Sequence, residues 1–122
     1  MTIIFTDGGA RGNPGPAAAG ALIGEKKFSK YLGEVTNNQA EYQAVILALE
    51  NCPDNDMLIN LDSGLVYNQL IGEYKVKHAN MKPLYEKVMS LMPGKNISFK
   101  LIPREENKIA DLLVNDELDK RK

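Results

Sequence analysis

Four acidic residues occupy positions where an α/β protein gathers its chemistry. Asp7 and Asp62 each follow a short apolar segment of strand type, and Glu41 and Asp111 lie near the starts of two predicted helices. The ends of strands and the starts of helices meet at one rim of an α/β sheet, where ligands bind. Carboxylates gathered at such a rim would bind a metal ion, since hard divalent cations prefer oxygen ligands. An acidic metal site is therefore the hypothesis to test.

Each of the four acids also has a local structural explanation. Asp7 precedes two glycines and can begin a turn by hydrogen bonding to its own downstream backbone. Glu41 lies three residues after Asn38, which is the spacing of a capping box, and Asp62 can cap the helix that follows it. Asp111 can be an ordinary acid in the first turn of a helix. Taken one at a time, these positions leave both explanations open.

The joint placement of the four acids favours the metal site. Four carboxylates brought to one rim repel one another unless cations neutralise them. Mg²⁺ fits such a set, because it is a hard ion that binds a few carboxylates together with the phosphate oxygens of a substrate. Two such ions about 4 Å apart can activate a water molecule and stabilise the leaving oxygen of a phosphodiester. The single His and single Cys offer no zinc site.

The pattern of apolar residues predicts the elements that position these acids. Alternating and β-branched segments predict strands, an apolar period of three to four residues predicts helices, and Gly and Pro mark turns. Crossovers through helices imply that the fourth and fifth strands pair in parallel, so the sheet is mixed. The predicted strands cover residues 2–6, 17–24, 26–34, 57–61 and 97–102, the predicted helices cover residues 38–50, 63–71, 81–91 and 107–118, and residues 8–16 are expected to form turns.

The chain as a whole bounds the class of protein. Its 122 residues, 43% of them hydrophobic, suffice for one domain over residues 1–122 and not for two. The net charge of -1 gives no overall basic field, so a nucleic acid must be held by a local patch and by metal. One cysteine excludes an internal disulfide and fits a reducing compartment. Because no apolar segment approaches the roughly 20 residues of a membrane span, we expect a cytoplasmic protein.

Five motifs lie along the chain: Thr6-Asp7-Gly8-Gly9, Gly12-Asn13-Pro14-Gly15-Pro16, Thr36-Asn37-Asn38-Gln39-Ala40-Glu41, Leu61-Asp62-Ser63 and Arg104-Glu105-Glu106-Asn107-Lys108-Ile109-Ala110-Asp111. Together they resemble type 1 ribonuclease H. They occur in the right order over nearly the whole chain, and the combination is specific although each motif is weak alone. The resemblance implies the ribonuclease H-like α/β fold, a five-stranded mixed sheet of strand order 3-2-1-4-5 with helices on both faces. It also implies Mg²⁺-dependent hydrolysis of the RNA strand of RNA/DNA hybrids, which leaves 5′-phosphate and 3′-hydroxyl ends, with Mn²⁺ as a further candidate ion.

The same resemblance implies roles for particular residues. Asp7 would bridge two metal ions, Glu41 and Asp62 would complete the shell on the substrate side, and Asp111 would hold the second ion. Amide side chains both donate and accept, which suits a 2′-hydroxyl beside base edges in a minor groove. Turn and cap chemistry is the alternative for these amides. The expected contacts to the hybrid come from Gly8, Gly9, Asn13, Asn37, Asn38, Gln39, Ser63, Lys75 and Lys77.

Two single residues depart from the family pattern. Many members have a His in the loop before the last acid, whereas this chain has Arg104, which cannot act as a general base. Arg104 can steady a phosphate or the departing product, and a solvated surface arginine is the alternative. Gly64 stands where many relatives carry a Gln, so one contact to the hybrid is expected to be missing.

A third departure is a short connection in place of a basic protrusion. Only residues 73–78 join the two middle helices, and Lys75, Lys77, His78 and Lys82 can form a small patch that faces phosphates. A solvated loop is the alternative. His78 lies in this connection and not among the acids, so we expect it to have no catalytic role.

Two other functions are compatible with the same fold. One is a non-catalytic module that binds RNA/DNA hybrids or RNA, but such a binder gains nothing from carboxylates placed near phosphates. The other is a different nuclease, such as a resolvase or integrase core, and the Asn-rich segments favour a hybrid substrate over it. We expect a monomer whose partner is an RNA/DNA hybrid, with no membrane association and no obligate protein partner.

Overall fold

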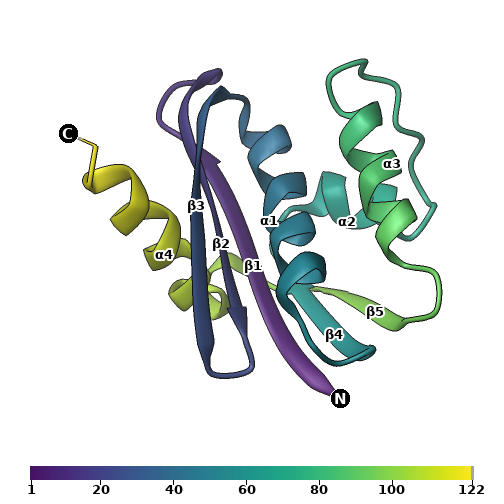
Figure 1. The fold of residues 1–122 in the computed structure, drawn as a ribbon. Helices are drawn as coiled ribbons and strands as arrows, with labels where there is room; N and C mark the ends of the chain where they lie inside the picture. The colour runs from purple at the N-terminus through teal and green to yellow at the C-terminus, as the bar shows by residue number, and fades with distance from the viewer. Residues whose placement is uncertain (122) are drawn as a thin grey trace.

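The computed structural model describes residues 1–121, which form one five-stranded sheet flanked by four helices (Figure 1). The strand order is β3-β2-β1-β4-β5, in which β1, β2 and β3 are antiparallel and β4 and β5 are added in parallel. This confirms the predicted mixed sheet and its order. The elements are β1 (Thr2–Ala10), β2 (Gly15–Ile23), β3 (Lys26–Val35), α1 (Asn37–Asn51), β4 (Asp56–Leu61), α2 (Gly64–Leu70), α3 (Lys82–Leu91), β5 (Asn96–Leu101), the short 3₁₀ turn η1 (Arg104–Glu106) and α4 (Lys108–Asp119).

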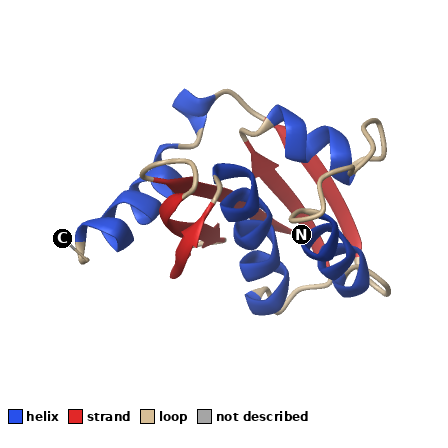
Figure 2. Ribbon diagram, turned by 90° about the horizontal axis from the view of Figure 1, so that it is seen from above, coloured by secondary structure: helices blue, strands red, loops and turns tan. Residues whose placement is uncertain are grey.

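Helices cover both faces of the sheet, as predicted. α1 lies against β1 and β2 on one face, with α2 and α3 beside it, whereas α4 lies against β1, β2 and β3 on the other (Figures 1 and 2). The main core lies between the sheet and α1 and includes the fully buried Tyr42, Ile4 and Ile59. A smaller core, with Ala18 and Val114, joins β2 to α4. Among the described residues, no helix combines the length and the apolar character that crossing a membrane requires.

The first strand is longer than predicted. The prediction ended it at Thr6 and assigned the glycines that follow to a turn, but the strand continues to Ala10. Gly8 is needed for steric reasons, because a Cβ atom there would lie 2.1 Å from the carbonyl carbon of Ala40 in α1. The glycine therefore allows the helix to approach the strand closely, and it does not mark a turn.

The sheet opens beside Asp7. β1 pairs in parallel with β4 only as far as Phe5 and Asn60, whereas its antiparallel pairing with β2 continues to Ala10. Asp7 thus lies inside a strand, and the prediction that it ends one is wrong. It does lie where β1 has lost its β4 neighbour, and Asp62 directly follows the end of β4. The rim expected to hold the site is therefore an opening between two neighbouring strands.

Candidate active site

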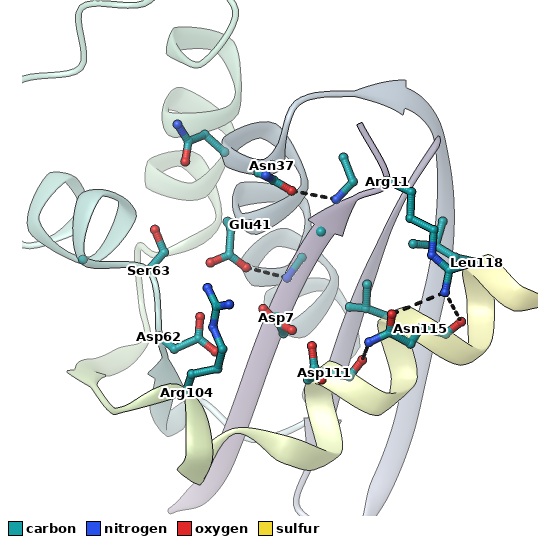
Figure 3. Close-up of a pocket in the computed structure, with 16 residues that line it drawn as sticks. Asp7, Arg11, Asn37, Glu41, Asp62, Ser63, Arg104, Asp111, Asn115 and Leu118 are labelled. Carbon is teal, nitrogen blue, oxygen red and sulfur yellow. Dashed lines mark hydrogen bonds between the residues drawn. The ribbon is translucent and has the colours of Figure 1, made fainter. Parts of the chain in front are cut away.

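A cavity of about 470 Å³ lies beside the middle of β1 (Figure 3). The side chains of Asp7, Glu41, Asp62 and Asp111 converge on it from β1, α1, the end of β4 and the first turn of α4. Six further predicted site residues line the same cavity: Gly8, Gly9, Asn37, Asn38, Ser63 and Arg104. Four predicted site residues lie outside its lining: Asn13, Gln39, Lys75 and Lys77.

Helix capping does not account for Glu41. The capping box of α1 is built by Thr36 and Gln39. The backbone N–H of Thr36 donates to Gln39 Oε1 at 2.9 Å, and the backbone N–H of Gln39 donates to Thr36 Oγ1 at 3.1 Å. The predicted box of Asn38 and Glu41 is therefore wrong. Glu41 lies further along the helix and accepts a hydrogen bond from the backbone N–H of Gly8. This bond holds its carboxylate against β1.

Asp62 is likewise free of a capping role. Ser63 is the N-cap of α2, and its hydroxyl accepts from the Val66 amide at 3.2 Å, so the predicted cap at Asp62 is wrong. The Asp62 carboxylate accepts instead from the side chain of Asn107, whose Nδ2 atom lies 2.9 Å from Oδ2. A capping serine thus leaves the neighbouring acid available to the cavity.

Asp111 lies in the first turn of α4, as predicted, and a second glycine brings that turn to β1. Asp7 pairs with Gly20 across β1 and β2. A Cβ atom at Gly20 would lie 2.8 Å from the carbonyl oxygen of Ala110, so α4 can begin directly against this strand pair. Residues paired across strands face the same side of a sheet, which puts the side chain of Asp7 on the α4 face. Asp111 therefore reaches the cavity next to Asp7.

Three of the carboxylates are close enough to share a cation. One oxygen from each of Asp7, Glu41 and Asp62 lies within 4.8 Å of the others. Burial, followed by the negative charge of Asp62, raises the pKa of Asp7 to about 7, and Asp111 adds to this rise. Burial and the charge of Asp7 raise the pKa of Glu41 well above its usual range. Carrying full negative charge therefore destabilises the cluster, and a hard divalent cation bound to its oxygens would relieve the repulsion. This is an acidic metal-binding site.

Two asparagines beside the cavity, Asn13 and Asn37, accept backbone hydrogen bonds through their side-chain oxygens. The backbone N–H of Asn37 donates to Oδ1 of Asn13 at 3.0 Å, and Oδ1 of Asn37 accepts from the backbone N–H of Ala10 at 2.7 Å. These contacts hold the β1–β2 loop against the start of α1. Turn and cap chemistry thus accounts for the oxygens, while the side-chain NH₂ groups of both residues have no hydrogen-bond partner among residues 1–121.

The cationic candidates fall into two groups. Arg104, in η1, is exposed beside Asp62 in the cavity lining, and its guanidinium makes no hydrogen bond or ion pair to another described residue (Figure 3). Lys75, Lys77 and His78 lie in the connection between α2 and α3, outside the acidic cavity. Lys75 lines a separate surface hollow against α3. Of the predicted cations, only Arg104 lies with the four acids.

The sequence does not reveal the side-chain contacts of Asn107. Its position four residues before Asp111 marks it as the N-cap of α4, and it is, but its side chain makes no capping hydrogen bond. It is 1% exposed and contacts Asp62 and the backbone of Thr6 instead. No local pattern distinguishes an Asn that caps a helix from one that faces inward, because both occupy the same position along the chain.

Comparisons with known proteins agree with the fold. A family model described as reverse transcriptase-like matches residues 5–117. Ribonuclease H of Ruthia magnifica is 33% identical over 139 residues, which cover 97% of this chain and 95% of that protein. A bifunctional protein of Mycobacterium tuberculosis is 37% identical over 128 residues, which cover 96% of this chain but only 35% of the longer protein. Among solved structures, LC11-RNase H1 in complex with an RNA/DNA hybrid has a TM-score of 0.93 at 41% identity, with 99% of each chain covered.

Proposed function

The chain belongs to the type 1 ribonuclease H family, and from this membership we propose that it is an endonuclease that hydrolyses the RNA strand of RNA/DNA hybrids. The observation that carries the proposal is the meeting of Asp7, Glu41 and Asp62 within 4.8 Å at a surface cavity. Capping does not explain Glu41 or Asp62, since other residues cap α1 and α2. The likeness to LC11-RNase H1, whose structure contains an RNA/DNA hybrid, supports the substrate class.

Mg²⁺ is the proposed metal, with Mn²⁺ as the second candidate. Every acidic donor at the cavity is a carboxylate oxygen, which is the ligand type that these hard ions prefer. We propose a site for two ions, in which Asp7 contributes to both. Glu41 and Asp62 would complete the side nearest the substrate, and Asp111 would hold the second ion. When bound, such a pair of ions supplies an activated water molecule and charge stabilisation at the leaving oxygen.

The proposed reaction is hydrolysis at the phosphorus of the RNA backbone. A bond forms from the water oxygen to phosphorus, and the bond to the 3′ oxygen breaks. The water gives up a proton to solvent and the 3′ oxygen takes one up, which leaves 5′-phosphate and 3′-hydroxyl ends. Arg104 stays protonated and so cannot take a proton from the water. We propose that it binds an oxygen of the scissile phosphate or of the departing 5′-phosphate. Its exposure and its unpartnered guanidinium support this role.

The hybrid would lie across the amide residues beside the cavity. The NH₂ groups of Asn13 and Asn37 are open donors, because only their oxygens are used within the fold. Ser63 keeps its O–H as a donor, since its oxygen accepts the cap hydrogen bond. We propose these groups, the NH₂ groups of Asn38 and Gln39, and the backbone at Gly8 and Gly9 as contacts to the hybrid. Lys75 and Lys77 would reach its phosphates further away.

A cleavage assay with mapped ends tests the proposal. Labelled RNA/DNA hybrid, RNA/RNA and DNA/DNA duplexes are incubated with the protein in Mg²⁺, in Mn²⁺ and in chelator. We expect cleavage of the RNA strand of the hybrid, only with metal, and with 5′-phosphate products. The Asp7→Asn variant, prepared in parallel, excludes a contaminating nuclease. Hybrid binding without cleavage in either ion would refute the proposal and would indicate the non-catalytic module instead.

A further inference from the structure

One side-chain amide joins two parts of the acidic site. Asn107 is 1% exposed, and its Nδ2 atom donates to the carbonyl oxygen of Thr6 at 2.8 Å and to Oδ2 of Asp62 at 2.9 Å. Thr6 immediately precedes Asp7 in β1. A single NH₂ group therefore fixes the carboxylate of one acid and the backbone next to another.

The orientation of this amide follows from its surroundings. Exchanging its nitrogen and oxygen would place Oδ1 against two acceptor oxygens, those of Thr6 and Asp62, so the donor must be where it is. The remaining Oδ1 atom is buried without a hydrogen-bond partner, and it is the only such side-chain atom among residues 1–121. Burying an unsatisfied acceptor costs stability. Stability alone therefore does not explain why an asparagine occupies this position.

A neutral donor is also the right chemistry for holding a metal ligand. An arginine or lysine at this position would orient Asp62 but would neutralise the charge that attracts the cation. The Asn107 amide instead occupies Oδ2 alone, and Oδ1 of Asp62 has no hydrogen-bond partner among the described residues. Metal affinity depends strongly on such outer groups that orient the ligands themselves.

We propose that Asn107 is a positioning residue, which aims the carboxylate of Asp62 and fixes β1 at Asp7 so that the two acids meet at one cation. The inference rests on the metal site of the proposed function. It concerns how that site is held, so it predicts a loss of metal affinity and not merely a loss of stability.

Asn60 provides a matched control. It is 4% exposed, and its Nδ2 atom donates to the carbonyl oxygen of Ile4 at 3.0 Å, two residues before the carbonyl that Asn107 contacts. Both side chains are buried amides that hold the backbone of β1. Asn60 hydrogen bonds to none of the four acids. Substituting either residue should destabilise the fold, whereas only Asn107 should affect metal binding.

The experiment measures Mg²⁺ binding to the complete protein without nucleic acid. The rise in melting temperature is recorded against Mg²⁺ concentration at constant ionic strength, and Mn²⁺ binding is measured directly from the loss of the free-ion electron paramagnetic resonance signal. We expect Asn107→Ala to weaken binding of both ions by about 10- to 100-fold and Asn60→Ala to leave it within about twofold of wild type. We also expect high Mg²⁺ to restore much of the cleavage by Asn107→Ala.

Each outcome decides a different question. Equal Mg²⁺ affinity in wild type and Asn107→Ala would overturn the inference, and so would an equal loss in Asn60→Ala. If Asn107→Ala does not fold, Asn107→Leu and Asn60→Leu keep the branched shape and the number of heavy atoms of each side chain while removing the donor, and the same comparison applies. Wild-type protein that binds neither ion would contradict the metal site of the proposed function itself.

Discussion

The backbone N–H of Gly8 donates to the carboxylate of Glu41, and this hydrogen bond joins β1 to α1 at the edge of the cavity. The contact is possible because Gly8 has no side chain. A Cβ atom there would lie 2.1 Å from the carbonyl carbon of Ala40 and 2.4 Å from the amide nitrogen of Glu41. The same glycine thus determines how closely the helix packs and where the acid is held.

Replacing Gly8 should therefore damage both stability and metal binding. Gly8→Ala places a methyl group against helix backbone that cannot rotate away, so we expect a loss of at least about 2 kcal/mol in the free energy of unfolding. Gly9→Ala is the control, because its Cβ atom would lie at an ordinary 3.5 Å from Val114 Cγ1. Urea unfolding with and without Mg²⁺ measures both effects. Equal stability of the two variants would show that α1 can move away from the strand.

Neutralising Asp7 should separate stability from activity. Asp7→Asn removes one charge from a buried acidic cluster, so the metal-free variant should melt at a higher temperature than wild type. Cleavage should fall by roughly a thousandfold, since the charge that attracts metal is reduced. Hybrid binding should largely survive because the shape is unchanged. Calorimetry in chelator, single-turnover cleavage and a hybrid-binding assay test these outcomes, and normal cleavage by the variant would refute the metal mechanism.

The raised pKa of Asp7 predicts how stability depends on pH in chelator. Since the pKa rises from 3.8 to about 7 on folding, the folded protein between these values holds a proton that the unfolded chain has released. The stabilisation is complete below about pH 4 and is lost as the pH rises through 7. The raised pKa of Glu41 acts in the same direction. The melting temperature of Asp7→Asn should therefore exceed that of wild type by more at pH 8 than at pH 4, whereas a constant difference would contradict the shift.

Arg104 should contribute to cleavage but not to metal binding. Arg104→Ala removes a cation proposed to bind a phosphate oxygen, and we expect kcat/KM to fall by about tenfold. The Mg²⁺-dependent rise in melting temperature should not decrease, because a positive charge near the acids opposes metal binding. Arg104→Lys should recover part of the activity. His78→Ala serves as the control and should cleave like wild type, since His78 lies outside the cavity. A near-total loss in that variant would overturn its assignment.

The two lysines between α2 and α3 should contribute to the salt dependence of hybrid binding. Changing Lys75 and Lys77 together to Gln should lower the slope of log affinity against log salt by up to roughly 0.9 for each phosphate that is no longer neutralised. Lys26 and Lys27 in the edge strand β3, changed in the same way, provide a control of equal charge. Titrations of hybrid at several salt concentrations measure the slopes. An equal change in both double variants would indicate a general charge effect and no local patch.

Much of the fold could be predicted because its signals are local. The apolar periods predicted α1, α2, α3 and α4 to within one residue at each end. The end of β1 was wrong because Gly8 and Gly9 have two physical uses. Glycine permits a turn, but it also permits a helix backbone to approach a strand, and only the three-dimensional packing decides between them.

The four acids could be predicted as a group, whereas the residues that cap the neighbouring helices and hold the acids in place could not. Both capping predictions failed because a residue one or two positions away makes the cap, as Thr36 does for α1 and Ser63 does for α2. Several polar side chains lie near the start of each helix, and small differences in geometry decide which one makes the capping hydrogen bond. Asn107 was beyond reach for another reason. Its partners, Thr6 and Asp62, lie in distant segments of the chain.

The contact between Asn107 and Thr6 joins residues that are 101 positions apart. Closing so long a loop costs chain entropy before the contact forms, so we expect the acidic site to form after the transition state for folding. Metal added to the protein should then lengthen the lifetime of the folded state and leave the rate of folding almost unchanged. The bound ion would therefore slow unfolding of a chain whose strands and helices are already in place.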